Sequence, residues 1–270
     1  MSKSFAVPSV RERITGALFG QLIGDCLGVP VHWYYTTATL HEHIAQFYND
    51  DGKGRLTNFH LPHPDAVHPD SYNAFKPELI EDFKPLFMSN FNRKFANSGK
   101  KIEDVWKAGT QYHCTLDLGE NTIGTMLSCE LRDLLTEEFT KQQEQEQIDK
   151  SSLYTTEKFV NKYLKFFTTP LHHDFYIGAL HRNFFKQVWK NGANPNIKEQ
   201  VTMKGNSSCN ADIAVVIPIM LFYFADLDKC KQVIRERVKH FYDSENAVNT
   251  NCVFAELFHD LLSWNCDSDA

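Results

Sequence analysis

The sequence predicts an all-α protein, because apolar residues recur at helical spacing in several segments and no alternating strand pattern of convincing length occurs. The chain has 270 residues, of which 42% are hydrophobic and 23% are charged, as in an ordinary globular protein. Its 21 phenylalanines predict a dense aromatic core. No internal repeat occurs, so we expect a single helical domain over residues 1–270, with long loops between the helices.

The first helix is predicted over about residues 10–27. Its apolar side chains recur every four positions, at Val10, Ile14, Leu18, Leu22 and Cys26. Gly28 and Pro30 then break the pattern. Residues 49–72 are rich in Gly, Pro, His and Asp and predict a long loop. The pattern of residues 78–95 is ambiguous and predicts no particular secondary structure.

A second helix is predicted to begin near Asn121. The Asn121 side chain is a good N-cap, since it can accept a hydrogen bond from a backbone N–H of the first turn. The helix is followed by an entirely polar run over residues 141–147. Such a run is typical of a solvated helix extension or a loose linker.

Further apolar spacing predicts helices around residues 159–167, 180–188 and 247–262. The run over residues 212–224 is apolar on nearly all sides, which is typical of a central helix. Pro218 lies inside this run and should bend the helix or leave a carbonyl without its hydrogen bond.

Charge, hydropathy and cysteine usage exclude several classes of partner. The formal net charge of −6 argues against binding to nucleic-acid phosphates. The longest apolar run, residues 213–225, is too short to cross a bilayer, so no membrane partner is expected. Seven single cysteines, no CxxC pair and no apolar run for a signal peptide predict a cytoplasmic protein.

Two groups of polar residues lie at helix ends, where they can either serve a functional site or cap the helix. Asp25 lies near the end of an apolar helix, a costly position unless the carboxylate has a partner, and it either serves a site or caps the next turn. Glu120, Asn121 and Thr122 start the second helix. Their oxygen atoms can hold a hard cation such as Mg²⁺, although helix capping explains Asn121 and Thr122 equally well.

A third polar group combines imidazole, carboxylate and guanidinium side chains. His173 and Asp174 precede a predicted helix, and Arg182 lies inside it. Such a set can bind an anionic substrate. The alternative is that these residues close a helix start and pair on the surface. No GxxxxGK[ST], GxGxxG, GxSxG or HExxH motif occurs elsewhere in the chain.

Several of these segments together resemble one enzyme family. Residues 13–20, running into Gly24-Asp25-Cys26-Leu27-Gly28, resemble the opening helix of the ADP-ribosylglycohydrolases, which include dinitrogenase-reductase-activating enzymes and J1-type crystallins. Five later segments resemble the crystallin-like branch, namely Val31–Tyr35, His68–Ser71, Tyr112–His113, Gly119–Thr122 and His181–Phe185. The similarity extends over about residues 11–262.

This resemblance implies an all-α, orthogonally packed domain whose cleft holds two Mg²⁺ ions. Enzymes of the family hydrolyse the glycosidic bond that joins ADP-ribose to a protein side chain, or a related bond. The partners implied are therefore an ADP-ribosylated protein or a small ligand that contains ADP-ribose. The metals hold the distal ribose hydroxyls and a water, which fits the general two-metal scheme for orienting reacting groups.

The resemblance also implies roles for individual residues. The Thr-Asp-Asp-Thr metal motif of the family corresponds to residues 119–122, which makes Glu120 and Thr122 the expected metal ligands. Glu120, His32 and His113 are the expected catalytic residues, and His32 stands where several members have a glutamate. The expected substrate-binding residues are Asp25, Asn121, His173, Asp174 and Arg182.

Two departures from the family pattern leave two functions open. Residues 119–122 carry an amide in place of one carboxylate, and no Asp-x-Asp-Thr run follows, so the fold is expected to be shortened at its C-terminus. Loss of carboxylates weakens Mg²⁺ binding. The chain is therefore either a hydrolase with altered metal dependence or a catalytically inactive relative, which has a crystallin-like structural role or binds ADP-ribose as a pseudoenzyme.

Overall fold

The computed structural model confirms the all-α prediction in the part of the chain that it describes. That part consists of residues 8–29, 37–38, 41, 89–90, 92–99, 101, 113, 115–117, 119–169, 172–174, 176–178, 180–181, 184–185, 212–242 and 244–264. Within these ranges the extended regular elements are helices, and no strand is present. None of the helices described there is long and apolar enough to cross a membrane.

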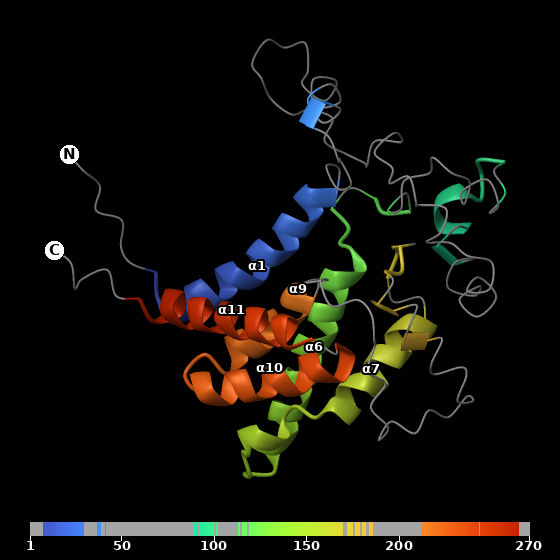
Figure 1. Ribbon diagram of the computed structural model, residues 1–270. Coiled ribbons are helices and arrows are strands. Elements are labelled where there is room, and N and C mark those ends of the chain that lie inside the picture. The colour runs from blue at the N-terminus through green and yellow to red at the C-terminus, as the bar shows by residue number, and fades with distance from the viewer. Residues whose placement is uncertain are drawn as a thin grey trace. The chain divides into compact units, whose positions relative to one another are not determined.

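The principal helices are labelled in Figure 1. They are α1 (Val10–Gly28), α6 (Ile123–Glu144), α7 (Thr156–Thr168), α9 (Asp212–Phe222), α10 (Leu227–Phe241) and α11 (Glu245–Ser263), with a short 3₁₀ helix, η2 (Lys150–Ser152). Five of the six long helices begin and end within a few residues of a predicted helix. Helix α10 is the exception. The polar run over residues 141–147 begins inside α6 and extends this helix as far as Glu144.

The internal contacts of the chain divide it into two compact units. Unit 1 consists of Met1–Gln21, Leu127–Tyr163 and Asn183–Ala270, and unit 2 consists of Leu22–Met126 and Leu164–Arg182. The single domain expected over residues 1–270 stays a prediction.

Helices α9, α10 and α11 pack against one another in unit 1 (Figure 1). Helix α9 buries most of its apolar surface and contains Pro218, as the apolar run predicts. Helix α10 buries one face and begins at an N-cap, Asp226, whose side chain accepts from the Lys229 N–H at 3.0 Å. Such a cap satisfies one of the N–H groups that lack a partner at a helix start.

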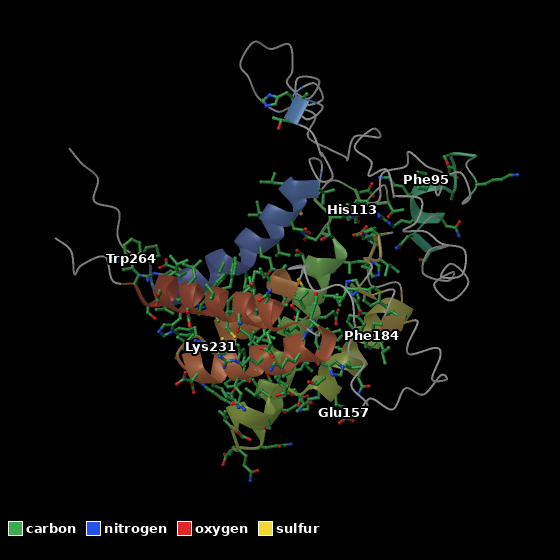
Figure 2. The ribbon with its side chains drawn as sticks, viewed as in Figure 1. Phe95, His113, Glu157, Phe184, Lys231 and Trp264 are labelled. Carbon is green, nitrogen blue, oxygen red and sulfur yellow. The ribbon has the colours of Figure 1, made fainter. Side chains whose placement is uncertain are left out.

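Aromatic side chains fill the core of unit 1, as the phenylalanine content predicts. Phe184, labelled in Figure 2, meets the Tyr163 ring edge to face at a centroid distance of 5.0 Å and stacks on Phe241 at 5.5 Å. The buried Arg237 guanidinium lies 4.4 Å from the ring centroid of Phe159 and 4.2 Å from that of Phe241. Cation–π attraction partly offsets the cost of burying this charge.

Candidate functional site

The start of α6, in unit 2, brings together residues that lie up to 99 positions apart. Asp25, near the end of α1, accepts from the Thr122 N–H at 2.7 Å and from the Thr122 hydroxyl at 2.9 Å. The Asn121 side-chain amide donates to Asp25 Oδ2 at 3.1 Å and to the Leu22 carbonyl at 2.8 Å. Asp25 thus has the partners that a half-buried carboxylate near the end of an apolar helix needs.

Two aspartates distant in sequence supply the capping at this end of α6. Asn121 is the N-cap expected from sequence, but its side-chain nitrogen donates to Asp25 and to the Leu22 carbonyl. The Thr122 N–H donates to Asp25, and the Ile123 N–H donates to Asp174 Oδ2 at 3.2 Å. A helix N-terminus favours negative charge, so these two carboxylates stabilise the start of α6.

Glu120 lies among polar side chains just before α6. The turn before it contains Gly119 at φ +83°, a left-handed conformation that glycine adopts without strain. Glu120 Oε2 accepts from the Asp117 backbone N–H at 2.7 Å and from Arg93 Nη2 at 2.9 Å. Glu120 Oε1 accepts from Arg93 Nη1 at 3.2 Å and is in hydrogen-bond contact with His173 Nδ1.

These contacts favour the ionised form of two carboxyl groups. Burial raises the pKa of Glu120, but the Asp117 N–H, the His173 ring and the Arg93 charge outweigh burial. The pKa of Glu120 therefore lies below its ordinary value. The pKa of Asp117 is lowered as well, chiefly by the hydrogen bond from Lys94 and also by the charge of Arg93.

Arg93 and Lys94 are functional-site candidates that the sequence does not single out. Arg93 donates to Asp117 Oδ2 at 2.8 Å, to both oxygens of Glu120 and to the Thr115 carbonyl. Lys94 forms an ion pair with Asp117. The local signal is only a basic pair in a segment of ambiguous pattern, and its acidic partners begin more than 20 positions later.

His113 and Asp174 form a buried pair in the same unit (Figure 2 labels His113). His113 Nδ1 lies 2.9 Å from Asp174 Oδ1, and the two side chains are 2% and 1% exposed. Asp174 Oδ1 also accepts from the Tyr176 N–H at 3.0 Å. With Ile123 included, the carboxylate of Asp174 connects three separate parts of the chain. This burial favours a structural role for both residues.

His173 has the opposite environment to its neighbour in sequence. Its side chain is 45% exposed, and its ring contacts Glu120. The backbone carbonyl of His173 accepts from the Thr115 hydroxyl at 2.6 Å, which holds this segment against the loop before α6. Among the residues predicted from sequence, His173 and Glu120 therefore combine mutual contact with access to solvent.

The structure joins most of the predicted site residues, in two adjoining groups. The first contains Asp25, Asn121 and Thr122, and the second contains Glu120, His173, His113 and Asp174. His32 and Arg182 lie outside the described residues, so their predicted roles stay predictions. Among the described residues, no group of three or more His, Cys, Asp or Glu side chains is arranged to hold a metal ion.

A family model described as ADP-ribosylglycohydrolase matches residues 6–269 of this chain. The match covers nearly the whole sequence, including every residue of the site described above. Comparison with curated proteins and with solved structures gave no match.

Proposed function

The chain belongs to the ADP-ribosylglycohydrolase family, and from this premise we propose that it binds an ADP-ribosyl group at the start of α6 without the metal-dependent hydrolysis of the family. The observation that carries the proposal is the convergence of Asp25 with Asn121 and Thr122. These are positions to which the family resemblance assigns the ligand site, and they meet although the chain separates them by more than 90 residues.

The chemistry of the exposed groups suits this class of ligand. ADP-ribose carries two phosphates and several ribose hydroxyls. Carboxylates accept from vicinal hydroxyls and cationic side chains attract phosphate, so a bound ADP-ribosyl group would exchange for part of the contacts that Glu120, Arg93 and Lys94 make with one another and with Asp117. His173, half-exposed beside Glu120, offers a further contact. The ligand is then an ADP-ribosylated protein or a small ADP-ribose compound in a cytoplasmic setting, with Arg182 as a further predicted contact.

Divalent metals are general in this family, but the residues placed here do not fit Mg²⁺. An ion of this kind needs oxygen ligands with free lone pairs, near 2.0–2.1 Å, in octahedral geometry. Glu120 Oε2 accepts from the Asp117 N–H and from Arg93 Nη2, and Oε1 accepts from Arg93 Nη1 and contacts His173 Nδ1, so the lone pairs of this carboxylate already have protein partners. Ligation of a metal would have to displace these protein donors, so no catalytic step is assigned to it.

Binding can be tested by titration calorimetry with ADP-ribose, with and without Mg²⁺. We expect micromolar affinity that is unchanged by Mg²⁺ or by chelator. The substitution Glu120→Gln should weaken binding at least tenfold, because it removes the negative charge that accepts ribose hydroxyls. Glu157→Gln, at an exposed position on α7, is the matched control and should bind as the unmodified chain does.

The outcomes separate the possible roles. Absence of ADP-ribose binding at millimolar concentration would overturn the proposal and leave a crystallin-like structural role. Equal affinity for ADP-ribose in the Glu120→Gln and Glu157→Gln variants would show that the ligand does not contact Glu120. Thermal melting of each variant establishes that it is folded before its affinity is compared.

Hydrolysis without metal is a second candidate, and the contact between His173 and Glu120 favours it. A carboxylate that orients an exposed imidazole can support proton transfer near neutral pH. His113, also predicted to be catalytic, is buried on Asp174 and suits a positioning role better. Release of ADP-ribose from arginine- and serine-linked peptides in chelator, lost in the Glu120→Gln, His32→Ala double variant, would establish this candidate.

A further inference from the structure

The guanidinium of Arg93 is in contact with three acceptor groups of the loop before α6. It donates to Asp117 Oδ2 at 2.8 Å, to Glu120 Oε2 at 2.9 Å and to the Thr115 carbonyl. Its side chain is 28% exposed, and that of Glu120 is 24% exposed. The fork of Arg93 therefore lies between two carboxylates and a carbonyl oxygen, which are the ligand types that a hard cation uses.

From this arrangement we propose that Arg93 is a built-in cation that takes the place of a divalent metal for Asp117 and Glu120. Arginine stays protonated at all ordinary pH values. It offers planar, paired N–H donors to carboxylates, and it is attached to the chain, so it does not dissociate as an ion does. Glu120, a predicted metal ligand, would then be held by protein alone.

The charges of the cluster balance without a metal. Asp117 and Glu120 together carry two negative charges, and Arg93 and Lys94 together carry two positive charges. Arg93 pairs with both carboxylates, and Lys94 pairs with Asp117. A divalent cation added to this set would produce an excess of positive charge and would have to compete with Arg93 for the same oxygen atoms. Electrostatic repulsion from the two basic side chains therefore opposes metal binding.

The neighbouring carboxylate, Asp25, also has protein donors as partners, but they come from the start of a helix instead of from an arginine. Asp25 accepts from the Thr122 N–H and hydroxyl, at the positive end of the α6 dipole. The partial positive charges of the backbone N–H groups there stabilise the Asp25 carboxylate, as Arg93 stabilises the Glu120 carboxylate. Glu120 at the family's metal motif and Asp25 beside it thus both have protein donors as partners.

Removing the guanidinium should recreate affinity for a divalent ion. Arg93→Met keeps a long side chain and leaves Asp117 and Glu120 without their shared cation. Arg93→Lys is the matched control, because it keeps the charge and loses the planar fork. The probe is Mn²⁺ alone, followed by electron paramagnetic resonance, with thermal melting in Mg²⁺ or chelator as a second measurement.

For the unmodified chain we expect no stoichiometric Mn²⁺ and the same melting temperature in Mg²⁺ and in chelator. Arg93→Met should melt roughly 3–10 °C lower in chelator, bind one Mn²⁺ per chain and recover at least half of the loss in Mg²⁺. Arg93→Lys should bind no Mn²⁺. Adding Glu120→Gln to Arg93→Met should abolish the new metal binding.

Two results would overturn the proposal. One is stoichiometric binding of Mn²⁺ by the unmodified chain, which requires only the native protein and does not depend on any variant folding. The other is a folded Arg93→Met variant that binds no Mn²⁺. Because no ADP-ribose is present, the outcome is independent of whether the chain binds an ADP-ribosyl group.

Discussion

Replacement of Asp174 by alanine tests whether this carboxylate stabilises the fold or serves the ligand. Asp174 is 1% exposed and accepts from His113 Nδ1 at 2.9 Å, from the Ile123 N–H at 3.2 Å and from the Tyr176 N–H at 3.0 Å. The Ile123 N–H belongs to the first turn of α6 and has no acceptor within its own helix. Alanine removes the acceptor of all three donors at once.

The expected loss of stability follows from these three contacts. Removing the partner of a buried donor costs about 1–3 kcal/mol. Because the site can relax and admit water, we expect the summed loss for the three donors to lie near the lower end of this range, at about 3–5 kcal/mol. For a chain of this size the melting temperature should fall by roughly 6–20 °C. Asp174→Asn, which keeps one acceptor oxygen, should lose about 1–3 kcal/mol.

Urea unfolding followed by far-ultraviolet circular dichroism measures this free energy. Asp133→Ala is the control, since Asp133 pairs with Arg132 at 2.7 Å at the surface, where the side chain is 45% exposed. It should change stability by less than about 0.5 kcal/mol. A loss for Asp174→Ala as small as that of the control would refute the structural role. Reduced ADP-ribose affinity at full stability would instead support the substrate-binding role predicted from sequence.

Two further predictions concern pH and capping. Burial lowers the pKa of His172 and of His240 to about 4, so between pH 6.5 and 4 the unfolded chain binds more protons than the folded chain. The free energy of unfolding should therefore be highest above pH 6.5 and fall as the pH drops towards 4, by about 3 kcal/mol for His172. In the His172→Leu variant the unfolding midpoint should depend less on pH. Asp226→Ala, which removes the N-cap of α10, should cost about 1 kcal/mol in urea unfolding, and Asp226→Asn should retain most of that stability.

Each of these two predictions has a contrary result. A His172→Leu variant as sensitive to acid as the unmodified chain would show that protonation of His172 does not drive the loss. Equal destabilisation by Asp226→Ala and Asp226→Asn would show that the negative charge near the start of α10, rather than the accepted hydrogen bond, carries the effect.

Most of the helical architecture was predictable because helical periodicity is a local property. The apolar spacing that starts at Val10 predicts α1, and the apolar run around Pro218 predicts α9. No helix is predicted over residues 227–241, where basic and acidic residues separate the apolar ones. Their spacing is nevertheless helical, and the buried face of α10 includes Cys230, Val233, Ile234 and Val238.

The residues of the candidate site could be predicted from the sequence, but the contacts between them could not. Asp25, Glu120 and Thr122 stand out in the sequence because polar groups at helix ends need partners and because they match family positions. Which partners they find depends on segments far away in the chain. His173 and Asp174 are neighbours in sequence, yet one is half-exposed beside Glu120 and the other is buried on His113.

Local patterns in the chain were thus enough to predict the helical class of this protein, most of its long helices and the family to which its motifs belong. That Arg93 lies between Asp117 and Glu120, and that Asp25 and Asp174 cap α6, is known only from the folded chain. The physical reason is that periodicity is set by neighbours along the chain. The partner of a carboxylate is set by whichever donor the folded chain brings within about 3 Å, because a hydrogen bond needs that distance and ionic attraction is strongest there.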